Sequence, residues 1–397
     1  PVLGDLVRRA GRRPSGGAPD AGAVRAQLAH LSEAEQEQWL QKHILETAAR
    51  LLGHESADAL DAERDFLESG FDSLAAMELR TTLNASTGLT LPTAAIFDQK
   101  TPAGLARFLR AELAAVAQPG QRSGTDESLY GMFRGAVQGG RARTGFALLR
   151  VAAQLRERFA SAADLDELPA PTRLAAGSDL PRIICINPPL ATGGAHQYAR
   201  VTAQLRAGRE VVVLPPIGFA ADEPLPATPE AALETLACGV LDAAQGEPFV
   251  LLGYSSGGLL AYLVTEYLEA AQGPVPEGVA MIDTYRVHDG GEWLLREMAE
   301  HMVSREAEFG RFDSARLSGM GWYVQLMQEM VPGTVATPAL LIQCAQSFLA
   351  STAERPDWQA RAWDPAHTVV PVEADHFTVL ESGSADTAAA IEDWLGS

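Results

Sequence analysis

The segment Gly253-Tyr254-Ser255-Ser256-Gly257 is the first part of the sequence that could do chemistry, because it fits the pattern G-x-S-x-G. It follows an apolar run at Phe249–Leu252 and precedes a helical stretch at 256–271. In such a strand–turn–helix context, the sharp turn lifts the serine hydroxyl above the edge of a sheet. The turn crowds the backbone, so small residues must flank the serine. Ser255 is therefore a candidate nucleophile.

A serine hydroxyl is a weak nucleophile and needs a neighbouring base. His376 is the candidate base, since it lies just past an apolar strand-like run at 368–372. Asp283 is the candidate carboxylate that orients it, because Asp283 closes the run at 279–282 at the same end of a sheet. The order Ser, Asp, His along the chain is that of α/β-hydrolases. The competing residues are His288, His301 and His367 for the base, and Asp289 and Asp375 for the carboxylate.

Attack on a carbonyl creates an oxyanion that needs N–H donors. The N–H of Ser256, the residue after the nucleophile, is one predicted donor. The second donor is expected in the loop Asn187-Pro188-Pro189-Leu190, which follows the first buried strand-like run. Proline has no backbone N–H, so Leu190 is the predicted second donor.

A second serine lies at the predicted start of a helix, in Leu67-Glu68-Ser69-Gly70-Phe71-Asp72-Ser73-Leu74. Asp72 can cap this helix, which leaves Ser73 in its first turn. The helix dipole favours an anion at that position, so a phosphodiester attached to Ser73 would be well placed. The alternative is that Asp72 and Ser73 only cap the helix.

The elements that must position these residues fall into two domains. Residues 1–23 are predicted to be a linker from a preceding domain, 24–116 a four-helix unit, and 117–126 a second linker rich in Gln, Pro, Gly and Ser. The second domain covers 127–397. It opens with two apolar helices within 127–160 that need a partner surface.

From residue 182 onward, apolar strand-like runs alternate with helical stretches. This alternation predicts a parallel sheet covered by helices on both faces. The segment 286–335 interrupts the pattern with a helical insertion rich in methionine, which we expect to lie over the strand ends. The predicted fold class is therefore an all-α domain followed by an α/β-hydrolase domain with a helical lid.

Composition limits the class of protein. The 397 residues carry a formal net charge of −20, which argues against a nucleic-acid partner because phosphates require a basic surface. Three cysteines form neither a disulfide framework nor a zinc motif. No apolar stretch reaches the length of a membrane span, and no signal sequence is apparent. A cytoplasmic protein without metal is the expectation.

The motif Gly70-Phe71-Asp72-Ser73-Leu74 resembles the phosphopantetheine attachment site of acyl carrier proteins of the polyketide type. Residues 127–397 resemble the thioesterase domains that end modular type I polyketide synthases, through the serine motif, Gly194-Ala195-His196-Gln197-Tyr198 and Asp375-His376-Phe377-Thr378. The resemblance implies that Ser73 carries 4′-phosphopantetheine, installed by a separate phosphopantetheinyl transferase. It also implies a homodimer through the helices within 127–160. In the second domain, Pro188-Pro189 departs from the Gly-Thr that is frequent there, which puts the second oxyanion donor in doubt.

The function that the resemblance implies is the release of a finished chain. A polyketide acyl chain from upstream synthase domains would pass from the Ser73 arm to Ser255. It would leave as a macrolactone if a hydroxyl of the chain attacks, or as a free acid if water attacks. The alternatives are a hydrolytic editing thioesterase and a carrier or docking module with an inactive hydrolase fold.

Overall fold

A computed structural model describes residues 21–54, 56–66, 69, 71, 73–92, 95–117, 126–178, 180–206, 208–306, 312–347 and 367–396. Most of the two predicted linkers lies outside these residues, and so does Asp72, the predicted cap of the Ser73 helix. Nearly all of the predicted catalytic domain lies within them.

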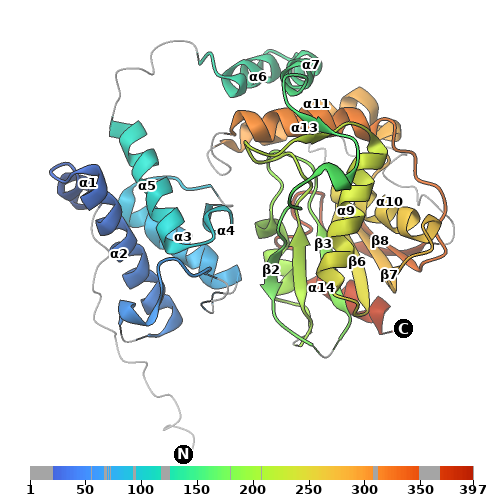
Figure 1. Cartoon of the computed structure of the whole chain (residues 1–397), viewed down its shortest axis with the longest axis horizontal. Helices are drawn as coiled ribbons and strands as arrows, with labels where there is room; N and C mark the ends of the chain where they lie inside the picture. Colours follow the sequence, from blue (N-terminus) through green and yellow to red (C-terminus); the bar gives the residue numbers. More distant parts are fainter. Residues whose placement is uncertain are drawn as a thin grey trace, which may run out of the picture.

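The first domain is helical, as predicted (Figure 1). Its helices are α1 (Ala21–Leu28), α2 (Glu33–Leu52), the short 3₁₀ turn η1 (Ala57–Ala59), α3 (Ser73–Thr87), α4 (Ala95–Gln99) and α5 (Pro102–Ala117). Ser32 and Glu35 form a capping box at the start of α2, and Gly53 ends α2 with φ 76°. Leu40, Ile44, Leu79 and Leu83 are fully buried between the helices. Helix α1 precedes the four helices expected and begins inside the stretch predicted to be a linker.

The second domain is built on a seven-stranded sheet with the order β2-β4-β3-β6-β7-β8-β9. Only β2 is antiparallel to its neighbour, and every other pair is parallel. The strands are β2 (Thr172–Ala175), β3 (Arg182–Ile186), β4 (Val211–Leu214), β6 (Phe249–Tyr254), β7 (Gly278–Ile282), β8 (Ala339–Cys344) and β9 (Thr368–Val372). The six parallel strands match the predicted runs, whereas β2 and the two-residue pair β1 (Arg158–Phe159) and β5 (Leu225–Pro226) were not predicted.

Helices cover both faces of the sheet, and for this reason its strands are continuously apolar. Ile184 and Ile186 of β3 belong to the core beneath α9 (Pro229–Ala244) and α10 (Ser256–Ala270). Ile183 and Cys185 of the same strand belong to the core on the other face, beneath α8 (Ala199–Thr202) and α14 (Ser384–Leu395). The loops that follow the parallel strands therefore gather at one edge of the sheet.

Two pairs of helices lie above that edge. The predicted lid contains α11 (Val287–Ser304) and α13 (Ser314–Met327), and α6 (Leu129–Gln138) and α7 (Ala142–Ala153) lie over them (Figure 1). A Cβ atom placed on Gly321 would lie 2.5 Å from Leu149 Cβ, so α13 and α7 pack at close range. The two N-terminal helices of the domain are thus packed against the lid.

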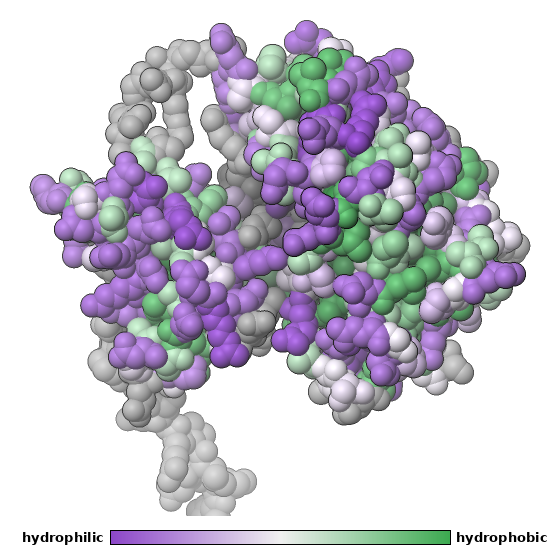
Figure 2. All heavy atoms as spheres, viewed as in Figure 1, coloured by the Kyte–Doolittle hydropathy of each residue, from purple (hydrophilic) through white to green (hydrophobic). Residues whose placement is uncertain are grey.

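One face of this helix pair stays uncovered. Met132, Val151 and Leu155 are 48%, 55% and 88% exposed, which is high for apolar side chains of this size. Figure 2 shows hydrophobic surface in the region of α6 and α7. Phe133 and Val137 are buried, so these three exposed side chains are additional apolar surface on α6, on α7 and just after α7.

Neither a membrane-spanning helix nor a metal-binding cluster is found in the part of the chain that the structure describes. None of its helices is long and apolar enough to cross a membrane. No group of three or more His, Cys, Asp or Glu side chains within it could hold a metal ion.

Candidate active site

Ser255 sits at a strained turn between β6 and α10, with φ 55° and ψ −130°. A non-glycine residue with positive φ is uncommon and marks a position that the surrounding structure holds in place. A Cβ atom on Gly253 would collide with the carbonyl oxygen of Gly257, and one on Gly257 would collide with that of Ile186. Both glycines of the motif are thus required by close backbone approach.

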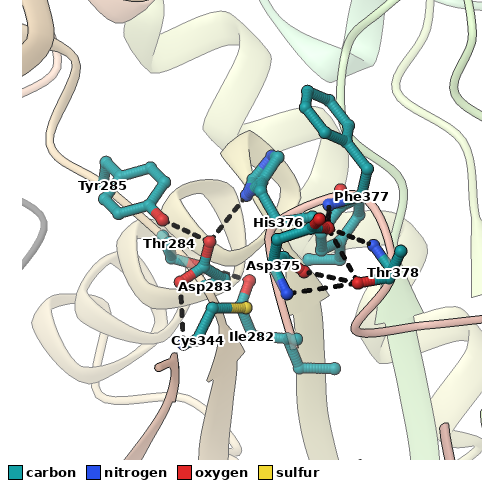
Figure 3. Close-up of polar contacts among 10 residues, drawn as sticks. Ile282, Asp283, Thr284, Tyr285, Cys344, Asp375, His376, Phe377 and Thr378 are labelled. Carbon is teal, nitrogen blue, oxygen red and sulfur yellow. Dashed lines mark hydrogen bonds and ion pairs between the residues drawn. The ribbon is translucent and has the colours of Figure 1, made fainter. Parts of the chain in front are cut away.

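His376 follows β9 and Asp283 follows β7, and the two side chains meet at the edge of the sheet (Figure 3). His376 Nδ1 lies 2.8 Å from Asp283 Oδ2. The other carboxylate oxygen of Asp283 accepts the backbone N–H of Cys344 at 3.0 Å, and the Tyr285 hydroxyl donates to Oδ2. Asp283 is 1% exposed, so these partners fix its position.

The environment keeps Asp283 ionised. Burial raises its pKa, but the hydrogen bond and charge of His376, together with the donors on Tyr285 and Cys344, outweigh burial. The pKa of Asp283 therefore lies below its ordinary value. An ionised carboxylate in contact with Nδ1 directs the Nδ1 proton toward itself, so Nε2 is the acceptor nitrogen of the neutral His376 ring.

The rival residues occupy other roles. Asp375 accepts the backbone N–H groups of Phe377 and Thr378 at 3.0 and 2.8 Å, so it braces the turn that carries His376. His367 lies before β9, at the opposite end of that strand from His376. The His301 ring stacks on that of Phe377 with centroids 3.4 Å apart. The side chains of His288 and Asp289 lie outside the described residues.

Two tyrosines that sequence reasoning missed hold the serine turn: Tyr254 connects it to the histidine turn, and Tyr198 connects it to the end of β3. The Tyr254 hydroxyl donates to the carbonyl oxygen of His376 at 2.6 Å, and the Tyr254 N–H donates to the Tyr198 hydroxyl at 3.1 Å. The Tyr198 hydroxyl in turn donates to the Ile186 carbonyl at 2.7 Å. Both residues stand inside quoted motifs, but only the folded chain shows what their hydroxyls contact.

The two predicted oxyanion donors differ in their surroundings. Ser256 is the first residue of α10, where a backbone N–H has no partner within the helix. The Leu190 N–H instead donates to the Pro188 carbonyl at 2.8 Å. The assignment of Leu190 as second donor therefore stays a prediction, and it requires this turn to open.

Two pockets meet at Ser255. The first, called the mouth pocket, is lined by Ser255 and His376 together with polar residues of the loop after β3, among them Thr192, His196, Gln197 and Arg200. The second, called the lid pocket, encloses about 470 Å³ including its openings. It is lined by Ser255, Ser256, Leu190, Tyr285, Leu294, Leu295, Met298, Val324 and Met327. The serine thus lies between a space with mixed polar and apolar walls and a space with almost entirely apolar walls.

The first domain reaches the mouth pocket through α3. Met77 and Arg80 of this helix line the pocket, and α3 contacts α8. The same helix begins at Ser73, whose side chain lies outside the described residues. The backbone at this helix start can accommodate a phosphodiester, because the first N–H groups of a helix lack partners within it. In the mouth pocket, buried polar atoms of His196 and Gln197 have no hydrogen-bond partner among the described residues, which fits a polar group entering between α3 and Ser255.

Comparison with known protein families assigns each of the two domains to a family. The family model of the thioesterase domain matches residues 181–395, more than half of the chain, so the chain belongs to the thioesterase domain family. A second model, the phosphopantetheine attachment site, matches residues 42–109, which identifies 4′-phosphopantetheine as the cofactor. The chain is therefore a carrier–thioesterase didomain of the kind found in modular polyketide synthases.

The relatives are much longer proteins. Polyketide synthase GfsE of Streptomyces halstedii is 36% identical over 426 residues, a match that covers 100% of this chain and 11% of that protein. Erythronolide synthase EryA3 of Saccharopolyspora erythraea is 31% identical, and the match covers 100% of this chain and 12% of that protein. A crystal structure of the NocB thioesterase domain in covalent complex with a fluorophosphonate nocardicin G analog matches 57% of this chain and 100% of its own, with 19% identity and a TM-score of 0.45.

Proposed function

We propose that this chain holds a polyketide acyl group on Ser73 and releases it through Ser255. One arrangement carries the proposal: Ser255 and His376 line the pocket to which carrier helix α3 contributes, and His376 is hydrogen-bonded to buried Asp283. When bound at Ser73, phosphopantetheine supplies the thiol that holds the acyl group as a thioester.

In the first step, Ser255 Oγ attacks the thioester carbonyl carbon while His376 Nε2 takes the hydroxyl proton. Asp283 orients the ring and stabilises its positive charge. The Ser256 N–H donates to the oxyanion. As the carbon–sulfur bond breaks, His376 returns the proton to the sulfur, and an ester on Ser255 remains.

In the second step, His376 activates a second nucleophile that attacks the Ser255 ester. A hydroxyl of the same acyl chain gives a macrolactone, and water gives a free acid. The apolar lid pocket favours an acyl chain folded beneath α11 and α13, where little water competes. Fusion to a carrier domain distinguishes this chain from a free-standing editing thioesterase.

The partners follow from the same reasoning. Upstream synthase domains supply the acyl chain, and a phosphopantetheinyl transferase modifies Ser73. A second copy of the chain covers the exposed face of α6 and α7, where Met132, Val151 and Leu155 stand. We place the protein in the cytoplasm, where such synthases would meet their acyl precursors.

A serine-directed fluorophosphonate probe tests the enzyme assignment. The parent chain should be labelled at Ser255, and Ser255→Ala should abolish labelling. Ser256→Ala is the matched control, because its hydroxyl lies one residue away at the same turn. Absence of labelling in the parent chain would favour a docking module with an inactive hydrolase fold.

A further inference from the structure

The mouth pocket contains buried polar atoms that the proposed catalytic steps do not use. His196 Nδ1 and Gln197 Oε1 are both buried, and neither has a hydrogen-bond partner among the described residues. Both residues line the pocket. Buried polar atoms without a partner are uncommon and cost about 1 to 3 kcal/mol each. Of the two, Gln197 Oε1 can meet a polar ligand in the pocket, whereas His196 Nδ1 faces the backbone of Gly194, so any contact from His196 to a ligand comes from its other ring nitrogen.

The ring of His196 supplies a hydrogen-bond donor. Burial lowers the pKa of His196 to about 3, and Arg316 and Arg80 contribute to this, so the ring is neutral at pH 7. A neutral imidazole has one donor nitrogen and one acceptor nitrogen. Nδ1 faces the backbone of Gly194, where a Cβ atom would lie only 2.6 Å away. We therefore assign the proton to Nε2, the nitrogen at the other side of the ring.

Gln197 supplies the complementary acceptor through Oε1. A donor and an acceptor on neighbouring residues match the carbonyl and the N–H of a secondary amide. Neither residue carries a charge at neutral pH, so the pair suits an uncharged part of a ligand.

Arg200 lies one turn further along the chain from His196 and Gln197, and these three side chains are together called the strip. Residues 196, 197 and 200 are spaced three and four apart along η4 (Ala195–Tyr198) and α8, which places them on one side of that stretch. Arg200 also lines the mouth pocket, and its side chain is exposed. Its guanidinium suits an anionic oxygen group such as a phosphodiester.

The strip runs between the two sites of the proposed function. Helix α3 of the carrier domain packs against α8 and contributes Met77 and Arg80 to the pocket, while Ser255 and His376 line the same pocket. A ligand that connects the start of α3 with Ser255 would pass these residues. Phosphopantetheine has the matching chemistry in the same order: a phosphodiester, two secondary amides and a terminal thiol.

We propose that His196, Gln197 and Arg200 form the binding strip for the phosphopantetheine arm. Nε2–H of His196 donates to an amide carbonyl of the arm, Oε1 of Gln197 accepts from an amide N–H of the arm, and Arg200 pairs with its phosphodiester. This assignment rests on the proposed function, because it takes the arm as the carrier of the thioester. It makes the three residues positioning residues rather than catalytic ones.

The test uses the full chain with Ser73→Ala, which removes the arm of its own carrier domain. One acyl group is supplied as the thioester of ethanethiol, N-acetylcysteamine, pantetheine or phosphopantetheine, and kcat/KM is measured for each. Every readout is a ratio between two substrates on one protein sample, so partial loss of folded protein cancels.

In this background, His196→Leu and Gln197→Leu should each lower the ratio of pantetheine to ethanethiol thioester about three- to tenfold, as expected for one hydrogen bond. His196→Gln should keep part of the preference, because its amide N–H can reach the place of Nε2. Arg200→Ala should lower the ratio of phosphopantetheine to pantetheine thioester by a similar factor, and less at high salt. Gln204→Leu and Arg107→Ala, two exposed positions that do not line the pocket, should keep the parent ratios.

Parent ratios in the His196, Gln197 and Arg200 variants would overturn the assignment, and so would an equal loss for all four thioesters. A parent chain that turns over none of the thioesters would contradict the proposed release chemistry itself, and the arm strip with it. The two failures are thus separate results of one experiment.

Discussion

His376 Nδ1 and Asp283 Oδ2 lie 2.8 Å apart although 93 residues separate them in the chain. Parallel strands β7 and β9 end at the same edge of the sheet with β8 between them, and this shared edge brings the two residues together. Asp283→Asn should leave the fold intact and lower kcat about 10³- to 10⁴-fold, because an amide no longer holds the tautomer that the base needs. Steady-state hydrolysis of a model thioester measures this.

Asp375→Asn is the matched control, since Asp375 braces the same turn through hydrogen bonds from the Phe377 and Thr378 N–H groups. We expect a much smaller loss of kcat in that variant. Equal losses in the two variants would mean that the carboxylates act only on the shape of the loop.

The Tyr254 hydroxyl links the serine turn to the histidine turn. Tyr254→Phe should therefore leave His376 in place but hold its position less firmly. The variant leaves the His376 carbonyl without its donor and should cost about 1 kcal/mol of unfolding free energy. We expect kcat to fall about tenfold, because about 1 kcal/mol corresponds to a factor of about 5 and misalignment of the His376 ring adds to it. Chemical denaturation and kinetics on the same variant measure both effects.

Tyr267→Phe provides the comparison, because Tyr267 lies near the far end of α10 from Ser255 and is only partly buried. A Tyr254→Phe variant with parent kcat would show that the link is not needed for catalysis.

The glycines of the serine turn should tolerate no side chain. Gly253→Ala would place a Cβ atom against the Gly257 carbonyl and should destabilise the domain by several kcal/mol, on the order of 3. Gly135→Ala is a matched change in an open position of α6, where a Cβ meets nothing within 4 Å. It should stabilise the chain by up to about 1 kcal/mol. Urea unfolding of both variants tests this, and a well-folded Gly253→Ala would refute the crowded turn.

The buried pair of Arg209 and Glu392 should make stability depend on pH. Burial raises the pKa of Glu392, but the bonds and charges of Arg209 and Arg206 outweigh burial and lower the pKa below its ordinary value. The stabilisation is therefore present above the ordinary pKa of about 4.3 and is lost as pH falls through the lowered value. Glu392→Gln leaves Arg209, 4% exposed, with an unpaired charge and should cost about 3 kcal/mol at pH 7.

Unfolding free energies measured from pH 7 to pH 3 check this, and the gap between parent and Glu392→Gln should shrink toward pH 3. The control is Glu33→Gln in the exposed pair with Arg110, where the Glu33 side chain is 83% exposed and the expected loss is below about 1 kcal/mol. A gap that stays constant over this range would contradict the linkage.

The exposed face of α6 and α7 should hold two chains together. Leu155→Glu should weaken a dimer observed by sedimentation velocity, because it places a charge in the apolar contact. Val275→Glu is the control, since Val275 is 44% exposed in the turn after α10, away from α6 and α7. A monomeric parent chain would reject the dimer.

Local patterns were enough to predict most of the catalytic domain. Continuous apolar runs such as Val211–Leu214 predict buried parallel strands, and helices such as α9 (Pro229–Ala244) occupy the stretches between them. The serine turn was predictable because G-x-S-x-G encodes a steric requirement of the backbone. Strand β2 has only four residues, of which one is buried, so its sequence is too short to predict a strand.

The parts that sequence could not predict depend on contacts across the fold. The sequence predicted Asp283 rather than Asp375 as the orienting carboxylate, but its contact with the His376 ring and the donors from Tyr285 and Cys344 are seen only in the fold. The Leu190 N–H donates to the Pro188 carbonyl within the same loop. The sequence argument, which only excluded prolines as donors, could not predict this hydrogen bond. The burial of polar atoms of His196 and Gln197 without hydrogen-bond partners among the described residues cannot be read from the sequence. It depends on how carrier helix α3 and the residues after β3 come together at one pocket.

Transfer of an acyl group from Ser73 to Ser255 is the measurement that tests the account most directly. A phosphopantetheinyl transferase loads Ser73 with a long hydroxyacyl arm, and peptide mass spectrometry follows the acyl group over time. We predict that the acyl mass appears on the peptide containing Ser255 in the parent chain and stays on the Ser73 peptide in His376→Ala. An acyl group that never reaches Ser255, or that reaches it equally fast without His376, would contradict the proposed mechanism.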